Sequence, residues 1–360
     1  MRILLWHVHG GWTDGFVRGE HEYVLPVDPE RSAWGLGRGG RDWPNTAEVP
    51  LEELASIADT LDAVVLQRPD EAKRVHELTG LRPGTDLPAV YLEHNIPKGA
   101  VPETRHLLAD QGEIPIVHVT HFNALMWDSG KAPAYVVEHG VVDPGLCYTG
   151  ELERLGVVVN EPVRRWRVAG TDLLGRFADV APLDVYGMGG DGLVEATGID
   201  AARLRWAGDV PTARLHAELA HRRAYLHPFR WTSLGLALIE AMMAGLPVVA
   251  LGSTEAWRAV PPAAGCVSSD VRELAAAARR FIAEPSAARE AGLAAREAAL
   301  ARYSLPRFLA DWDEVLADVR GEPLATAGVA TAGAATVGAG AQQTSSTRPE
   351  APTVPRGTFL

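Results

Sequence analysis

Residues 227 to 250 read HPFRWTSLGLALIEAMMAGLPVVA, and this stretch decides the fold. It begins as the end of a strand and continues through a loop into an apolar segment of helical length. After Gly245 and Pro247 it finishes in a second apolar run. A buried helix followed by a buried strand is typical of parallel α/β sheets, whose strands are covered by helices on both faces. The stretch therefore predicts one unit of an α/β fold.

The same alternation of short β-rich runs and helical patterns extends in both directions from this stretch. Eleven runs are expected to be strands, which is more than one sheet comfortably holds. The segment 147–155 separates five of them from the other six, so we place a domain boundary near residue 153. We predict two Rossmann-like, doubly wound parallel-sheet domains, residues 1–153 and 154–304. The expected strands lie at 2–8, 62–66, 89–92, 116–119 and 135–138, and then at 156–159, 183–186, 204–206, 224–226, 247–251 and 265–267.

The last part of the chain carries two further features. A final amphipathic helix is expected over 305–321, because Phe308 and Trp312 stand four residues apart on one apolar stripe. From Glu322 onward the chain consists mainly of Ala, Gly, Thr, Ser and Pro, with almost no charge. Such a segment cannot bury enough apolar surface to offset its ordering entropy, so 322–360 is predicted to be disordered.

Composition and charge exclude several classes of protein. The 360 residues are 47% apolar and 22% charged, as in a globular protein with a substantial core. A net charge of -12 argues against nucleic-acid binding, which requires a clustered basic surface. Cys147 and Cys266 are expected to be unpaired thiols in a reducing cytosol. The apolar run after Met1 is too short for a signal peptide, and 234–251 is interrupted by charge, glycine and proline. We therefore expect a cytoplasmic protein without a membrane span.

The loop of the deciding stretch has the features of an anion-binding site. It leads Ser233, Leu234 and Gly235 into a helix N-terminus, where unpaired amides and the helix dipole favour negative charge. Gly235 allows a phosphate to approach the backbone closely. Glu240 lies further along the otherwise apolar helix, and ribose hydroxyls are suitable hydrogen-bond partners for its carboxylate. The alternative is a core helix in which Glu240 pairs with a neighbouring arginine.

The stretch resembles the donor-site signature of the retaining family-4 glycosyltransferases. The resemblance implies the GT-B fold, in which two Rossmann-like domains face each other across a cleft. It implies that Glu240 holds the donor ribose and that loop amides around Gly235 and Leu236 hold the diphosphate. Thr232 stands where these enzymes have a glutamate that touches the donor sugar. The matching residues are Gly235, Glu240, Ala241, Met242, Gly245, Pro247, Val248 and Val249.

Weaker matches to the same family occur in the first half of the chain. Gly10 and Gly11, followed by Trp12, come after the first strand, where the family has a glycine loop beneath acceptor and diphosphate. The alternative is an ordinary tight turn. His94 follows the third expected strand, where relatives place a histidine near the reacting sugar; the alternative is a histidine satisfied in a loop. We expect three further residues to line the cleft on this side, namely Glu93, Asn95 and His121.

The second half of the chain supplies candidate phosphate cations and a candidate base pocket. Arg164, Arg165 and Arg167 follow a strand at the place where relatives clamp the donor phosphates. A guanidinium fork suits a phosphate; the alternative is a solvated basic turn. Gly187 and Gly208 match the glycine turns that form the wall of the base pocket in the family.

The resemblance implies a metal-independent, retaining glycosyltransferase that moves a sugar from a nucleotide-diphosphate donor to a hydroxyl acceptor. No metal and no cofactor are expected, because His118 and His121 have metal-ligand spacing but lack a supporting ligand set. The rivals are a nucleotide-sugar epimerase, for which Glu93 is a candidate carboxylate, and a non-catalytic GT-B protein. As in similar chains, the helix 305–321 is expected to cross back to the first domain; the alternative is that it covers its own C-terminal domain.

The acceptor side of the first domain gives less information. Three tryptophans suggest a stacking surface for a sugar or a flat metabolite, and we expect a soluble acceptor. The glycine-rich segment 35–43 is a candidate mobile loop that closes over the substrate. The tryptophans are Trp12, Trp34 and Trp43.

Overall fold

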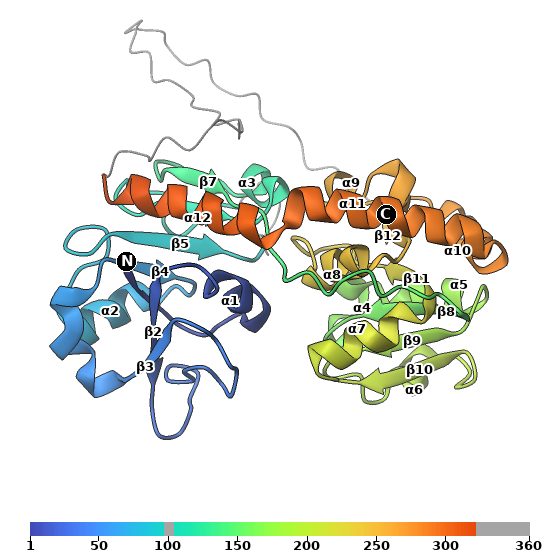
Figure 1. Cartoon of the computed structure of the whole chain (residues 1–360), viewed down its shortest axis with the longest axis horizontal. Helices are drawn as coiled ribbons and strands as arrows, with labels where there is room; N and C mark the ends of the chain where they lie inside the picture. Colours follow the sequence, from blue (N-terminus) through green and yellow to red (C-terminus); the bar gives the residue numbers. More distant parts are fainter. Residues whose placement is uncertain (97–103, 322–360) are drawn as a thin grey trace, which may run out of the picture. The chain divides into compact units, whose positions relative to one another are not determined.

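The computed structural model describes residues 1–96 and 104–321, which form two parallel β-sheets with helices on their faces (Figure 1). The first sheet has seven strands in the order β3-β2-β1-β4-β5-β6-β7. Its helical elements are α1 (Gly10–Phe16), η1 (Leu51–Thr60), α2 (Glu71–Thr79) and α3 (His121–Met126). The strands are β1 (Arg2–Leu5), β2 (Glu22–Val27), β3 (Thr46–Pro50), β4 (Ala63–Leu66), β5 (Ala89–Glu93), β6 (Ile116–His118) and β7 (Ala134–Val136).

The second sheet has six strands in the order β10-β9-β8-β11-β12-β13. They are β8 (Leu152–Val158), β9 (Leu183–Tyr186), β10 (Leu204–Gly208), β11 (Arg222–His227), β12 (Val248–Leu251) and β13 (Gly265–Ser268). The helices are α4 (Pro162–Ala169), α5 (Leu174–Ala178), α6 (Leu193–Thr197), α7 (Thr212–Ala220), α8 (Leu236–Ala244), α9 (Ala256–Ala259), α10 (Val271–Ala283), α11 (Pro285–Tyr303) and α12 (Leu305–Val319). We call the first sheet with its helices the N-terminal lobe and the second the C-terminal lobe.

Both sheets are covered on two faces, as the continuous apolar strands predict. Along β1, Ile3 and Leu5 pack in one hydrophobic cluster with α1, while Leu4 packs in another with η1 and α2. All strand pairs are parallel, and in each sheet the order reverses between the first and the fourth strand. This is the doubly wound Rossmann arrangement, so the predicted fold class is confirmed.

All eleven expected strands are present, and β2 and β3 are two further strands that the sequence pattern does not predict. The reason lies in their composition. β2 contains Pro26 and β3 ends at Pro50, and a proline normally argues against a strand because it cannot donate a ladder hydrogen bond. Here Pro26 pairs in register with Val49 of the edge strand β3, and its carbonyl accepts from the Gly37 amide (3.0 Å).

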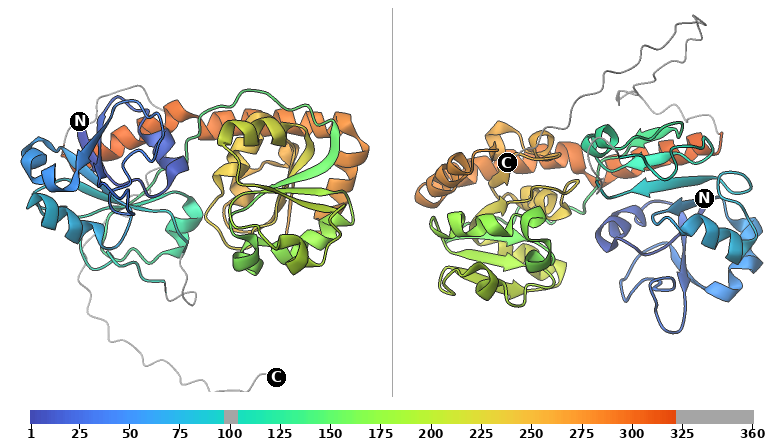
Figure 2. Two further views of the ribbon diagram at one scale, coloured as in Figure 1. Left: turned by 90° about the horizontal axis from the view of Figure 1, so that it is seen from below. Right: turned by 180° about the vertical axis from the view of Figure 1, so that it is seen from behind.

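The last helix lies against the N-terminal lobe (Figures 1 and 2). Phe308 and Trp312 of α12 are 0% and 1% exposed and belong to the same cluster as Trp12 and as Ile3 and Leu5 of β1. In the other direction, the chain that leads into β8 already packs on the C-terminal lobe, because the amides of Tyr148 and Thr149 donate to carbonyls of α8 and α7. The predicted disordered tail, 322–360, lies outside the described residues.

Helix α8 is apolar on nearly all sides because it is buried between the C-terminal sheet and α11. Gly245 ends it in the left-handed conformation (φ 90°), a position that favours glycine. Gly292 of α11 faces this turn, and a β-carbon there would lie 2.0 Å from the Gly245 carbonyl oxygen. The two glycines let helix and turn approach closely. Within the part of the chain that the structure describes, no helix combines the length and apolarity needed to cross a bilayer.

Candidate active site

The carboxyl end of the C-terminal sheet carries the segments that the sequence analysis assigned to the donor. β8 and β11 are neighbours where the strand order reverses, and ligands of doubly wound sheets bind outside the strand ends at this point. The loop 228–235 leaves β11 here and enters α8. The amides of Gly235, Leu236 and Ala237 have no hydrogen-bond partner among the described residues, as expected for a first helical turn open to an anion.

This donor loop is fixed at its start and open towards its end. The guanidinium of Arg230 binds Asp172 (2.6 and 2.8 Å), and the Arg230 amide donates to the Val168 carbonyl (3.0 Å). Leu234 is buried, whereas Thr232 and Ser233 are partly exposed and their hydroxyls have no partner among the described residues. The loop therefore presents two free hydroxyls and a row of free amides from a fixed base.

Glu240 projects from α8 towards α7. Its carboxylate lies 3.4 Å from Nε2 of His216, and its side chain is 17% exposed. The nearby Tyr225 hydroxyl is buried and has no hydrogen-bond partner within residues 1–96 and 104–321, and burial together with the Glu240 charge raises the pKa of Tyr225. Among the described residues Glu240 forms no ion pair with an arginine, which the alternative interpretation required. The Glu240 carboxylate and the Tyr225 hydroxyl can therefore each form a further hydrogen bond to a ligand.

The three candidate arginines do not share one environment. Arg164 is 70% exposed and pairs with Glu161, and Arg167 is 73% exposed and pairs with Asp172 (3.2 Å). Arg165 is half-buried, has no ion pair among the described residues, and lies over the Phe229 ring at 5.6 Å. Burial lowers the pKa of Arg165, as expected for a cation without a compensating carboxylate. The geometry therefore favours Arg165 among the three as a phosphate ligand.

The two glycine turns of the expected base pocket are joined to each other. The Gly187 amide donates to the Gly208 carbonyl (3.0 Å), and Gly187 has a φ of 120°. A β-carbon at Gly187 would lie 2.4 Å from the Val159 carbonyl oxygen, so this position requires glycine. The Asn160 side chain accepts from the Met188 amide (3.0 Å) and links the loop after β8 to the loop after β9.

In the N-terminal lobe, two histidines meet at the carboxyl end of the sheet. His9 precedes α1 and is exposed, and its ring lies 3.9 Å from that of His94, which follows β5. His94 Nε2 lies 3.3 Å from Oε1 of Gln67. The Nε2 amide of the same Gln67 side chain donates to the Trp6 carbonyl (2.8 Å). Burial, and then the neighbouring histidines His9 and His139, hold the pKa of His94 well below its usual range. This shift favours the neutral form of the His94 ring.

His9 was not among the candidates from the sequence. A histidine beside a glycine pair carries no special pattern, and its pairing with His94 depends on the adjacency of the β1 and β5 strand ends across β4.

The glycine pair connects the lobes at this point. Gly10 and Gly11 open α1, and a β-carbon at Gly11 would lie 2.8 Å from Cδ1 of Leu236, the first residue of α8. The starts of α1 and α8 are therefore adjacent. A larger residue than glycine at position 11 would displace Leu236 at the mouth of the donor loop.

The expected tryptophan surface is wrong for Trp12 and Trp43. Trp12 is 3% exposed and packs against Phe16 (ring centroids 4.6 Å apart) and Trp312 (5.6 Å) beneath α12. Trp43 is also 3% exposed, and its ring nitrogen donates to Asp14 (2.8 Å). Both rings belong to the core of the N-terminal lobe, so neither is available for stacking on an acceptor.

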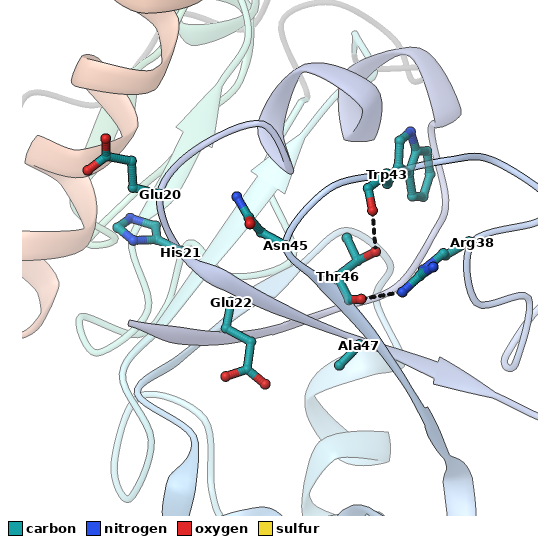
Figure 3. A pocket seen from close by; sticks show the side chains of 8 residues that line it. All are labelled: Glu20, His21, Glu22, Arg38, Trp43, Asn45, Thr46 and Ala47. Atoms are coloured by element: carbon teal, nitrogen blue, oxygen red, sulfur yellow. Dashed lines mark hydrogen bonds between the residues drawn. The ribbon is translucent and has the colours of Figure 1, made fainter.

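The segment 35–43 forms hydrogen bonds to β3 through Arg38. The Arg38 amide donates to Glu48 (2.8 Å) and its guanidinium to the Thr46 carbonyl. Arg38, Thr46 and Trp43 line a depression of about 420 Å³ where β2 and β3 begin (Figure 3). This depression lies at the opposite sheet edge from the histidines, so it is not part of the candidate site.

The remaining cleft candidates have other partners. Glu93 is 6% exposed; one oxygen accepts from the Asn95 amide (2.6 Å) and the other lies 3.4 Å from His106 Nε2. His121 is exposed at the start of α3. His118 is buried, and its Nε2 lies 3.2 Å from Oγ of Ser129. Burial lowers the pKa of His118 to about 4. Across residues 1–96 and 104–321 no group of three His, Cys, Asp or Glu side chains has the arrangement of a metal site.

Comparison with known proteins bears on the same segment. Residues 171–284, which include the donor loop and α8, match the family model described as Glycosyl transferases group 1. This match lies within the C-terminal lobe and covers less than half of the chain. The group 1 match begins after the arginines of α4 and ends after α10. No curated protein matches the chain by sequence.

Solved structures resemble this chain over both lobes. Sucrose-phosphate synthase from Thermosynechococcus elongatus superposes with a TM-score of 0.65 at 15% identity, over 89% of this chain and 99% of that one. Anabaena HepE in complex with UDP superposes with a TM-score of 0.64 at 14% identity, over 88% of this chain and 100% of that one. A glycosyltransferase from Rickettsia africae gives 0.63 at 12% identity, over 88% and 98%. These likenesses show that the two lobes form the GT-B fold.

Proposed function

We propose that this protein transfers a sugar from a nucleotide-diphosphate sugar to a hydroxyl group of a soluble acceptor in the cytoplasm, without a metal and with retention of anomeric configuration. The observation that carries the proposal is the first turn of α8 within the group 1 segment. It presents three unpaired amides at the point where the C-terminal sheet reverses its strand order. HepE, which shares the fold, is known in complexes with UDP and with UDP-glucose.

The proposed donor lies across the carboxyl end of the C-terminal sheet. Its diphosphate binds the amides of Gly235 and Leu236 and the guanidinium of Arg165, with Ser233 and Leu234 leading into that turn. Its ribose binds Glu240, and its base lies by the turns of Gly187 and Gly208. As the glycosidic bond breaks, negative charge grows on the leaving diphosphate. Fixed amides and a cation stabilise this charge without reorganisation, which is the usual source of electrostatic catalysis.

On the acceptor side, the proposed sugar faces the start of α1 and the histidine pair. Because the neutral form of the His94 ring is favoured, it acts as a hydrogen-bonding group for the sugar and not as a cation. Thr232, with a free hydroxyl, takes the position of the family glutamate. Asn95 and His121 stand further out on the same lobe. The epimerase alternative loses support, because Glu93 is occupied by the Asn95 amide and His106.

A panel of nucleotide sugars tests the activity. Incubation with UDP-, GDP- and ADP-sugars should release free nucleotide in an acceptor-dependent manner from one member of the panel, with EDTA present as well as without it. An altered donor sugar without release would instead identify an epimerase. Binding without any turnover would identify the non-catalytic alternative, and loss of turnover in EDTA restored by magnesium would contradict metal independence.

Replacement of Glu240 by Gln should weaken nucleotide binding by about 1–3 kcal/mol, since a charged hydrogen bond to the ribose is lost. Calorimetric titration with the nucleoside diphosphate of the preferred donor measures the effect. Glu290→Gln on the exposed face of α11 is the matched control and should bind as wild type does. A folded Glu240→Gln protein with unchanged affinity would remove Glu240 from the donor site.

A further inference from the structure

A cluster of charged side chains lies at the amino-terminal ends of the strands of the C-terminal sheet, whereas the donor loop lies at their carboxyl ends. Asp184 of β9 is 0% exposed and receives hydrogen bonds from arginines on the three strands around it. Arg154 of β8 binds it through Nε and Nη2 (2.9 and 2.8 Å), Arg205 of β10 through Nε (2.9 Å), and Arg222 of β11 through Nε (2.8 Å). All four residues stand near the amino-terminal ends of their strands.

The three arginines carry more positive charge than is needed to neutralise the Asp184 carboxylate. One bidentate arginine is sufficient to neutralise a buried carboxylate, but here three guanidinium groups share one. Burial opposes ionisation of Asp184, but the bonds from Arg154, Arg205 and Arg222 lower its pKa to about 2, so it is charged. The surplus is two positive charges, in a chain whose net charge is -12.

Nearby acids do not remove this surplus. The Glu218 carboxylate lies 4.0 Å from Arg222 and is paired more closely with Arg214 (2.7 Å). Counting Glu218 and Arg214 together adds one negative and one positive charge to the cluster, so its surplus stays the same. Asp200 uses its Oδ1 to accept from the Ala202 amide (2.8 Å). No other carboxylate pairs with the three arginines among the described residues, so two positive charges remain without a fixed counter-charge.

The unused donors of these arginines adjoin a depression. Arg154, Asp184, Arg205 and Arg222 line a space of about 500 Å³, together with Leu152 and residues 201–202. Arg205 is 52% exposed, and both of its terminal nitrogens have no partner among the described residues. Such planar guanidinium groups match the oxygens of a phosphoryl group, and a dianion would balance the surplus.

We propose that this depression, which we call the arginine depression, binds a phosphoryl group, either as inorganic phosphate or as part of a small phosphomonoester. The site is distinct from the proposed donor site, because it lies at the amino-terminal edge of the same sheet. The arginines fix the anion against strands β8 to β11, the strands whose other ends carry the donor segments. Nothing in this proposal depends on glycosyl transfer.

The test is calorimetric titration of the full chain with inorganic phosphate and, separately, with glycerol 3-phosphate, in the presence of UDP. Both are applied to wild type, Arg205→Gln, Arg165→Gln and the exposed control Arg272→Gln, whose side chain is 92% exposed. Arg205→Gln should weaken binding of the preferred probe about tenfold, the loss of one charge-assisted hydrogen bond. It leaves Arg154 and Arg222 on Asp184, and a thermal melt verifies its folding. Arg272→Gln should bind as wild type does.

The two sites are separated by the reciprocal variant. Arg165→Gln should keep phosphate binding and lose affinity for UDP, so a failure of the donor assignment leaves the arginine depression testable. Tighter binding of glycerol 3-phosphate than of phosphate would identify an ester as the ligand, and equal binding the free anion; both support the site. Wild type that binds neither probe, or a folded Arg205→Gln that binds both as tightly as wild type, would overturn it.

Discussion

Arg165→Ala is expected to lower kcat/KM for glycosyl transfer by about 10²–10³-fold, the usual effect of removing one preorganised group that stabilises a developing negative charge. Arg165 is half-buried beside Phe229, and no carboxylate pairs with it among the described residues. In the proposed complex its counter-ion is the leaving diphosphate. Steady-state kinetics with the preferred donor measure the change in kcat/KM.

The adjacent arginine provides a matched control for this experiment. Arg164 belongs to the same helix, carries the same charge and forms an exposed pair with Glu161. Because the Arg164 guanidinium is 70% exposed and already has Glu161 as its counter-ion, Arg164→Ala should change kcat/KM little. Equal losses in both variants would mean that general positive charge, and not a specific contact of Arg165, supports the reaction.

Trp312→Ala should lower the free energy of unfolding by about 3–5 kcal/mol, because a large buried ring is replaced by a cavity. Trp312 is 1% exposed and contacts Trp12 and Phe16 (ring centroids 5.6 and 5.0 Å apart). Denaturant unfolding of the full chain measures the loss. Trp257→Ala is the control, since this ring is 57% exposed on the C-terminal lobe and its removal should cost much less. A similar small change in both variants would contradict the close packing of α12.

The sequence predicts the C-terminal lobe better than the N-terminal lobe, for a physical reason. A strand such as β12 is buried on both faces and is therefore a continuous apolar run that can be recognised by itself. β2 and β3 contain prolines and take their place through pairing with neighbours, which no local pattern reveals. The same limit applies to Trp12, whose burial depends on a helix near the other end of the described chain.

The candidate site shows a similar division. Gly235, Leu236 and Glu240 are recognisable because a helix start and a carboxylate in an apolar helix are local features. The difference between Arg164 and Arg165 is not local, because it depends on where Glu161 and Phe229 lie in three dimensions. The arginines around Asp184 come from three separate strands, so their convergence appears only when the sheet order is known.

The packing of α12 on the N-terminal sheet has a consequence for synthesis on the ribosome. The core around β1 includes Phe308 and Trp312, which are translated about 300 residues after Trp12. At a synthesis rate of roughly 5–20 residues per second, α12 is translated about 15–60 s after Trp12. During that interval the apolar face of α1 lacks its final cover, while the C-terminal sheet emerges and folds behind it. The N-terminal lobe is therefore made first and completed last.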